Sequence, residues 1–386
     1  MDFTESDEHV LLREAVRSVG AKFGHEYYAK CTEDDVRPET LWQAVADHGF
    51  LGVHLPEQYG GGGAGIYELA IVCEELAAVG APLLLILVSA AISAEVIAKF
   101  GDEDQKQQWL PGLATGTKMV FAITEPDAGS NSHRIATTAT RDGDVYRLNG
   151  SKTYISGVDE APQVLVVCRT GFDEDTERAR LSLFVVDTDA PGLHRTLIPM
   201  EIRAPEKQFQ LFFDNVEVPA NRLIGAEGEG LRQVFEGLNP ERIMSATICT
   251  GVGRYALALA AQYANDRAVW GTPIGRHQGV AHPLAMAKIE LELARLMTQK
   301  AAWSHDRATD RVAAGEAANM AKYASAEAGL HCLDQAIQTH GGNGLASEYG
   351  LADLWGIVRL LKIAPVSREM VLNFVSTASL GLPKSY

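Results

Sequence analysis

The first third of the chain has the apolar spacing of α-helices. Between Thr4 and Leu113, apolar residues recur three and four positions apart, as in Leu12, Val16 and Val19. Thr4 and Asp7 resemble a capping box in which Asp replaces the usual Glu. We therefore expect an N-terminal helical domain, residues 1–118.

Two short segments of this region resemble functional motifs. Gly60 to Gly65 is glycine-rich, but it lacks the Gly-Lys-Ser/Thr ending of a phosphate loop, so it predicts a turn. Pro82 to Ile92 is strongly apolar, yet it is about half as long as a membrane span and is soon followed by Glu95 and Lys99. It predicts a buried core helix.

The spacing of apolar residues along the chain changes near residue 119. Short segments rich in β-branched and aromatic residues follow, separated by turn signals such as Asp142-Gly143 and Asn149-Gly150. They predict a compact antiparallel β-barrel or sandwich, residues 119–228. The expected strand segments are Met119–Thr124, Tyr146–Leu148, Lys152–Ser156, Val164–Cys168, Ser182–Val186 and Phe209–Phe213.

Long amphipathic patterns return after Gly228 and predict a C-terminal four-helix bundle, residues 229–386. The fold class is therefore α+β, with a helical domain, a β-domain and a helical bundle in that order. The expected bundle helices are Leu231–Ala264, His282–Ala314, Glu316–Thr339 and about Val366–Leu380.

Composition narrows the class of protein. The chain has 386 residues, 46% of them apolar and 22% charged, which is typical of a soluble globular protein. A formal net charge of −16 argues against nucleic acid as a partner. Neither a basic signal peptide nor a C-x-x-C pair is present, so we expect a cytoplasmic protein without a metal site. The five cysteines are Cys31, Cys73, Cys168, Cys249 and Cys332.

Two segments of the β-region have the chemistry of a flavin site. In Thr124-Glu-Pro-Asp-Ala-Gly-Ser130 the proline and glycine enforce a turn. Thr124 and Ser130 then present hydroxyl and backbone N–H groups that suit an isoalloxazine edge and a phosphate. In the next segment, strand alternation puts Tyr154 and Ser156 on one face.

Two segments of the C-terminal region complete the pattern. Arg267 to Gly271, with His277-Gln278, supplies a cation and an aromatic ring close together. Gln338 to Gly344 ends a helix with backbone that can approach a pyrophosphate. Each segment alone also fits an ordinary turn, surface contact or helix cap; the combination is much more specific.

Taken together in this order, the segments resemble the acyl-CoA dehydrogenase family over essentially the whole chain. The spacing from Glu241-Arg242 to Arg267 and Gln278 also matches the family pattern. Further matching pieces are Leu55–Gly60, Gly101–Lys106, Trp109–Pro111 and Val216–Pro219.

The resemblance implies FAD between the β-domain and the bundle of a homotetramer, or dimer of dimers. The family oxidises an acyl-CoA thioester to the trans-2-enoyl-CoA in lipid and fatty acid metabolism. A carboxylate removes the α-proton, a β-hydride passes to flavin N5, and electrons leave through an electron-transferring flavoprotein. The implied flavin contacts are Thr124, Ser130, Tyr154, Ser156, Ser367 and Glu369. The implied contacts to the pyrophosphate and adenosine, across the subunit interface, are Arg267, Trp270, Gln278, Gln338 and Gly342.

The position of the base departs from the commonest family pattern. A gapless count from Gly342 places the usual glutamate at Pro365, which cannot accept a proton. Isovaleryl- and long-chain-type members carry the glutamate on another helix, before an arginine, and Glu241-Arg242 matches that pair. We therefore predict that Glu241 is the base. The competing explanation is a glutamate favoured by the dipole at a helix start.

Pro365 also removes the backbone N–H that helps to hold the thioester carbonyl in the family. Losing one such donor costs roughly 3 kcal/mol of transition-state stabilisation. Either another donor such as the Val366 N–H replaces it, or the substrate is held differently. We assign substrate contacts to Ser130, Arg242 and Val366.

Two other functions fit the same residues. One is a flavin monooxygenase or oxidase, which does not need the thioester donor. The other is a catalytically silent FAD-binding subunit of a hetero-oligomer; the presence of every expected cofactor residue in this chain counts against it.

Overall fold

The computed structural model describes residues 4–307 and 310–384. The expected helical region forms at the N-terminal end, but Ser6 and not Thr4 is the N-cap of the first helix, because the Ser6 side chain accepts from the His9 N–H. The helices of this region are α1 (Asp7–Gly20), α2 (Gly24–Glu33), α3 (Glu39–Asp47), α4 (Ile66–Ala78), α5 (Leu85–Val88), α6 (Glu95–Phe100) and α7 (Glu103–Ala114).

The apolar segment at Pro82 to Ile92 is buried inside the fold, as predicted. Helix α5 continues through a π-helical turn, Ser89–Ala94, into α6. This turn packs against a bundle helix at Gly237, where an added Cβ would come within 3.0 Å of the Ile92 Cα. The glycine therefore permits the close approach of the two elements.

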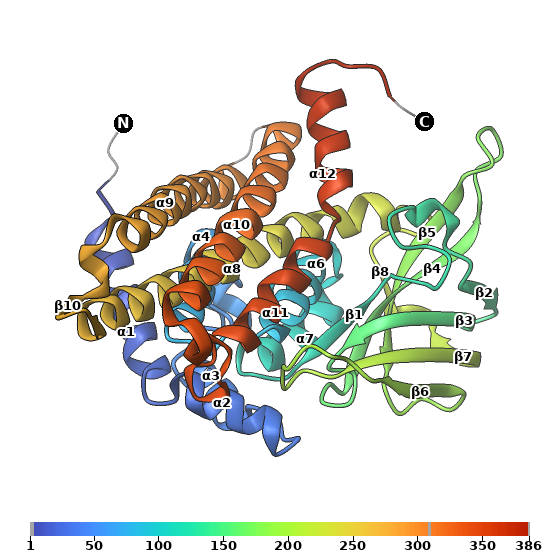
Figure 1. Cartoon of the computed structure of the whole chain (residues 1–386). Helices are drawn as coiled ribbons and strands as arrows, with labels where there is room; N and C mark the ends of the chain where they lie inside the picture. Colours follow the sequence, from blue (N-terminus) through green and yellow to red (C-terminus); the bar gives the residue numbers. More distant parts are fainter. Residues whose placement is uncertain (1–3, 308–309, 385–386) are drawn as a thin grey trace.

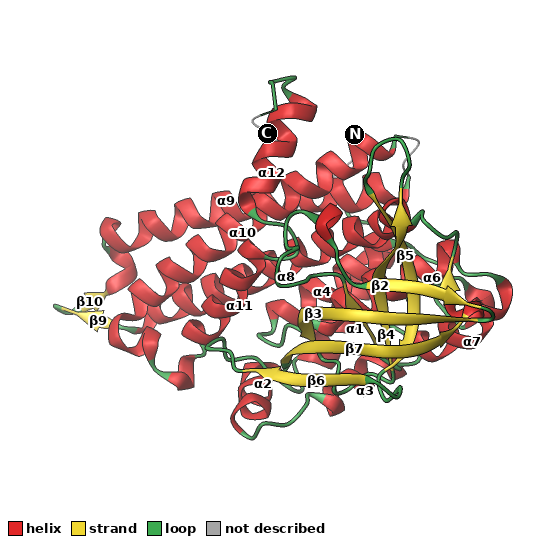
Figure 2. Cartoon of the chain, turned by 90° about the vertical axis from the view of Figure 1, so that its right-hand side faces the viewer, coloured by secondary structure: helices red, strands yellow, loops and turns green. Residues whose placement is uncertain are grey.

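The middle of the chain forms an eight-stranded sheet with the order β6-β7-β3-β2-β4-β5-β8, and β1 pairs with β4. Most pairs are antiparallel, but β1 and β2 both run parallel to β4. The sheet lies at one side of the helical layers (Figure 2). Its strands are β1 (Met119–Ala122), β2 (Thr138–Asp142), β3 (Val145–Ser156), β4 (Gln163–Phe172), β5 (Ala179–Asp187), β6 (Leu193–Ile198), β7 (Gln208–Pro219) and β8 (Leu223–Ile224).

The C-terminal part is helical. Helix α10 packs on α8, α9 and α11, and α8 also packs on α9 and α11 (Figure 1). The helices are α8 (Gly230–Asp266), α9 (Gln278–Asp306), α10 (Arg311–His340), α11 (Leu351–Ile363) and α12 (Arg368–Phe374). A hairpin of β9 (Ala268–Val269) and β10 (Thr272–Pro273) joins α8 to α9.

Two helix predictions were wrong in extent. The expected helix at residues 282–314 spans two helices, because Asp310 caps α10 by accepting from the N–H groups of Val312 and Ala313. The fourth bundle helix is α11, which the sequence pattern missed. The segment expected there, residues 366–380, contains the short α12, which rises above the bundle in Figure 1.

Helix α8 is the central helix of the bundle. By length and composition it could cross a membrane, but 72% of its most apolar window is buried inside the fold. Gly251 lets α4 approach it, since an added Cβ would lie 2.4 Å from the Glu74 carbonyl oxygen. At its other end Gly230 approaches the Leu181 backbone of β5. Helix α8 thus connects the β-domain to the far end of the bundle.

Candidate active site

The first two predicted cofactor segments lie side by side. The Thr153 N–H of β3 donates to the Thr124 carbonyl oxygen, 2.9 Å away. Glu125 organises the turn: its carboxylate accepts from the Lys152 ammonium at 2.8 Å and from the Thr137 N–H at 3.0 Å. The turn is therefore fixed to the sheet by a buried ion pair.

Sequence reasoning missed this ion pair. Lys152 is fully buried and Glu125 is 6% exposed. Burial lowers the pKa of Lys152, and the negative charge of Glu125 opposes that shift. No local pattern indicates that the two pair across the turn, although a lysine in an otherwise apolar strand is itself a signal that a buried acid lies nearby.

Tyr154 and Ser156 flank the buried Ile155 and stay outside the core. Tyr154 lies where the β3–β7 register shifts, has a φ of 57° and is 60% exposed. The Ser156 hydroxyl and the Gln208 side-chain oxygen lie 3.0 Å apart. The aromatic ring thus stands on a bulge and is free to contact a ligand.

The third and fourth segments lie together at another end of the molecule. Tyr263 of α8 joins them: its ring centroid is 4.2 Å from that of His340, and its hydroxyl accepts from the Asn343 amide at 3.2 Å. Trp270 is at the tip of the β9–β10 hairpin and is 88% exposed. Other exposed predicted contacts in this region are Arg267, Gln278, Gln338 and Gly342.

One chain therefore does not bring all four segments together. In both Figure 1 and Figure 2 the β9–β10 hairpin lies at the opposite side of the molecule from β3. The predicted contacts across a subunit interface require this separation, and they stay a prediction.

Glu241 lies in the middle of α8, directly after Pro240. The helix begins at Gly230, more than two turns earlier, whereas the helix dipole acts within the first turn. A glutamate favoured by a helix start is therefore not the explanation. Burial raises the pKa of Glu241 to about 8, and the positive charges of Arg242 and Lys322 oppose this shift.

Arg242 does not form a direct ion pair with Glu241 within the described residues. Its guanidinium donates instead to the Asn239 side-chain oxygen at 2.8 Å and lies 5.7 Å from the Phe235 ring centroid. Burial lowers the pKa of Arg242, and Glu241 opposes that shift. The Glu241 carboxyl group is thus half-buried and without a neutralising contact, which suits an exchangeable proton.

Pro365 lies in the segment between α11 and α12 and follows a cis peptide bond. Lys322 of α10 fixes this segment, donating to the Lys362 carbonyl oxygen at 3.0 Å and to that of Val366 at 2.5 Å. Ser367 caps α12 by accepting from the Met370 N–H at 3.3 Å, and Glu369 follows in the first turn. Sequence reasoning missed Lys322, which holds this segment and whose positive charge also acts on Glu241.

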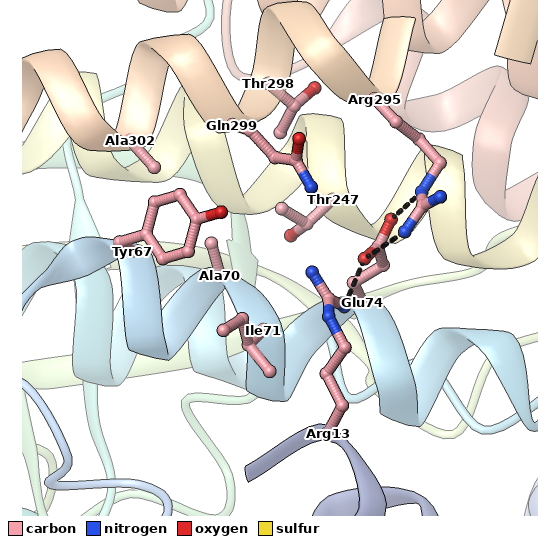
Figure 3. A pocket seen from close by; sticks show the side chains of 10 residues that line it. All are labelled: Arg13, Tyr67, Ala70, Ile71, Glu74, Thr247, Arg295, Thr298, Gln299 and Ala302. Carbon is pink, nitrogen blue, oxygen red and sulfur yellow. Dashed lines mark hydrogen bonds and ion pairs between the residues drawn. The ribbon is translucent and has the colours of Figure 1, made fainter. Parts of the chain in front are cut away.

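Two cavities lie away from these residues. The one in Figure 3 has a volume of about 20 Å³, between α1, α4, α8 and α9, and includes Glu74 and Arg295 in its lining. This is room for about one water molecule. The other, about 370 Å³, lies on the β-domain near Asp189 and Arg195. No predicted site residue lines either cavity.

All five cysteines are buried and free. Within residues 4–307 and 310–384, no group of three or more His, Cys, Asp or Glu side chains is arranged to hold a metal ion.

Three family models match the chain in order. They are the acyl-CoA dehydrogenase N-terminal domain over residues 6–117, the middle domain over 120–216 and the C-terminal domain over 228–380. Acyl-CoA dehydrogenase FadE12 of Mycobacterium tuberculosis strain H37Rv is 57% identical over 385 residues, covering 100% of this chain and 99% of the relative. The chain belongs to the acyl-CoA dehydrogenase family.

Solved structures show the acyl-CoA dehydrogenase fold as well. Glutaryl-coenzyme A dehydrogenase in complex with glutaryl-CoA matches with a TM-score of 0.92 and 30% identity, over 100% of this chain and 98% of the other. Glutaryl-CoA dehydrogenase from Mycobacterium smegmatis, in complex with FADH2, matches with a TM-score of 0.90 and 26% identity. The match covers 99% of this chain and 97% of the other. The predicted α+β architecture is confirmed.

Proposed function

We propose that the protein is an FAD-dependent dehydrogenase that converts an acyl-CoA thioester to the trans-2-enoyl-CoA, with Glu241 as the base. One observation carries this proposal. Among the described residues, the carboxyl group of Glu241 lies inside α8 without an ion-pair partner, and its pKa responds to the charge of Lys322, whose ammonium holds the segment that contains Pro365. The usual position of the base, in that segment, holds proline.

The residues present fit a flavin. The turn held by Glu125 leaves Ser130 exposed, and the bulge of β3 exposes the Tyr154 ring. We assign Thr124, Ser130, Tyr154 and Ser156 to the flavin side of the cofactor. Arg267, Trp270, Gln278, Gln338 and Gly342 of a second subunit would hold its pyrophosphate and adenosine. Ser367 and Glu369 would contact the flavin from α12. FAD supplies the hydride acceptor when bound.

Glu241 would remove the α-proton of the thioester. That proton is weakly acidic, so an effective base needs a raised pKa. Burial provides this at Glu241, whose pKa is raised to about 8. The charges of Arg242 and Lys322 keep the ionised form accessible near neutral pH.

The thioester carbonyl needs a hydrogen-bond donor that Pro365 cannot supply. We assign this role to the Val366 N–H, with Ser130 and Arg242 as further substrate contacts. The position of Val366, directly after Pro365, supports this assignment. Lys322 holds the Val366 carbonyl oxygen and so fixes the peptide that follows Val366, directly after the N–H proposed as the donor.

We further propose a homotetramer. Helix α9 exposes a row of large apolar side chains at helical spacing, and such a row is buried in a stable assembly. The row consists of Met286, Ile289, Leu293, Leu296 and Trp303. Leu293→Glu should reduce the molar mass measured by light scattering from a multiple of 41.7 kDa toward the single chain. An unchanged mass would exclude this face as the interface.

Free buried cysteines support a reducing compartment, so we place the enzyme in the cytoplasm. Electron-transferring flavoprotein is the proposed electron acceptor, in lipid and fatty acid metabolism.

Anaerobic titration of the purified holoenzyme with a panel of acyl-CoAs tests the proposed function. We expect the flavin absorbance to bleach with at least one member of the panel. Glu241→Gln should retain the flavin spectrum but fail to bleach. No bleaching with any acyl-CoA would contradict the proposal and favour a silent FAD-binding subunit. Rapid reoxidation of the reduced protein by oxygen would favour a monooxygenase or oxidase.

A further inference from the structure

Lys322 is a buried lysine that has no direct contact role in the proposed reaction. It is 1% exposed, in α10, and its ammonium donates to the carbonyl oxygens of Lys362 and Val366. These two acceptors stand on either side of Pro365. One cation therefore fixes both ends of the segment that joins α11 to α12.

The same ammonium faces charged and titratable groups of two other helices. Helix α8 contributes Glu241, Arg242 and the Cys249 thiol, and α12 contributes Glu369. Burial and, to a smaller extent, the charge of Arg242 lower the pKa of Lys322 to about 8, against the opposing effects of Cys249, Glu241 and Glu369. Lys322 in turn is one of the two cations that oppose the effect of burial at Glu241.

We propose that Lys322 is a positioning residue that couples the Pro365 segment to the base: one ammonium holds the segment and sets the proton affinity of Glu241. The part of this inference that concerns catalysis rests on the proposed role of Glu241. The coupling between the Pro365 segment and the proton affinity of Glu241 does not depend on that role.

The physical reason is that Lys322 and Glu241 titrate as a pair. Ionised Glu241 favours protonated Lys322, and hydrogen bonds from a charged donor to a carbonyl oxygen are the stronger ones. The state in which Glu241 can accept a proton is therefore also the state in which the segment around Val366 is held most firmly.

Three variants of the holoenzyme separate this role from a merely structural one. Lys322→Met removes the charge and keeps an unbranched stem; Lys322→Arg keeps the charge. Lys362→Met is the matched control, because its ammonium pairs with Glu327, 2.8 Å away, while its carbonyl is unchanged. Two readouts are needed besides activity. Infrared difference spectra follow the C=O stretch of protonated Glu241, assigned by its loss in Glu241→Gln. Hydrogen exchange follows the backbone of residues 362–368.

We expect Lys322→Met to raise the titration midpoint of Glu241 by about one pH unit and to speed hydrogen exchange of the segment. Lys322→Arg should keep both near the wild-type values, and Lys362→Met should leave the midpoint unchanged. A folded Lys322→Met protein with an unchanged midpoint would overturn the proposal, whether or not exchange increases. A raised titration midpoint with unchanged hydrogen exchange of the segment would also overturn the proposal. Should Lys322→Met not fold, Lys322→Gln takes its place as the uncharged variant.

Failure of the base assignment gives a different result. If Glu241→Gln left α-proton exchange of bound acyl-CoA intact, Glu241 would not be the base. The infrared titration would still report whether Lys322 controls the proton affinity of Glu241.

Discussion

Two glutamates of this chain, Glu74 and the half-buried Glu241, show how surroundings decide the charge state of one residue type. Glu74 is 5% exposed and receives hydrogen bonds from Arg13 and Arg295. Burial alone would raise its pKa, but Arg295, Arg13 and Arg254 lower it to about 2. Glu241 has no such contact, and burial raises its pKa to about 8. The first glutamate is a fixed charge, and the second can exchange its proton.

The raised pKa of Glu241 has a cost in stability that depends on pH. Folding raises this pKa from 4.5 to about 8, so between these values the folded chain keeps a proton that the unfolded chain releases. With respect to this carboxyl group, stability is therefore fully retained below about pH 4.5 and is lost as the pH rises from there toward 8. Glu241→Gln has no such loss, so we expect its Tm advantage over wild type to be larger at pH 9 than at pH 5.

Thermal unfolding of both proteins at the two pH values measures this difference. Glu217→Gln, at an exposed ion pair with Arg147, is the matched control and should show little pH dependence. An advantage of Glu241→Gln that is equal at pH 5 and pH 9 would mean that folding does not raise the pKa of Glu241.

At the scale of elements, the turn from Thr124 to Ser130, which we propose contacts the flavin, depends on the buried pair of Glu125 and Lys152 rather than on its own sequence. Lys152→Met should leave the Glu125 carboxylate without its cation. Breaking one partner of a buried pair costs about 3–5 kcal/mol. We expect the free energy of unfolding, measured with urea, to fall by a similar amount, and we expect the variant to retain FAD less well. The double variant Lys152→Met with Glu125→Gln should recover part of the stability, and no recovery would show that the pair is not what holds the turn.

The sequence predicted elements where one pattern dominates. The buried helix near Leu85 and the long α8 follow from apolar spacing alone. The extent of α9 and α10 was missed because alanine-rich helical spacing continues through their junction, although Asp310 carries an N-cap signal. Strand β6 was missed because most of its side chains are exposed and its apolar residues, at the two ends, do not alternate with polar ones.

The site residues divide in the same way. Motif residues such as Thr124, Tyr154 and Glu241 could be named in advance because the family pattern fixes their order. Glu125 and Lys322 could not, because each acts through partners far away in the sequence and its role depends on burial. Charge pairing of this kind is visible only when the elements are assembled.

At the scale of the whole molecule, an arginine–glutamate network ties the N-terminal helices to the bundle. Glu74 and Glu75 of α4 bind arginines of α1, α8 and α9. Figure 3 shows Glu74 between Arg13 and Arg295. Each of these arginines forms an ion pair with Glu74 or Glu75. The pairs fix the helices around α8, which carries Glu241.

Glu74→Gln should therefore destabilise the protein by about 3 kcal/mol, because it leaves buried arginines with too little negative charge. Urea-induced unfolding at pH 7 measures the loss. Glu217→Gln again serves as the exposed control and should have no measurable effect. The pKa of Glu74 is lowered from 4.5 to about 2. The higher free energy of unfolding of wild type relative to Glu74→Gln should therefore disappear as the pH falls from 4.5 to 2. An equal effect of both substitutions at pH 7 would contradict the role of the network.

The identity of the base is the central claim, and α-proton exchange tests it most directly. Holoenzyme is incubated anaerobically in D2O with an acyl-CoA that bleaches the flavin, and deuterium at the α-carbon is measured by mass spectrometry from pH 6 to 9. We predict that wild-type exchange rises with pH through an apparent pKa near 8. Glu241→Gln, with its flavin still bound, should exchange about 10²–10⁴-fold more slowly. Exchange at the wild-type rate in Glu241→Gln would contradict the account.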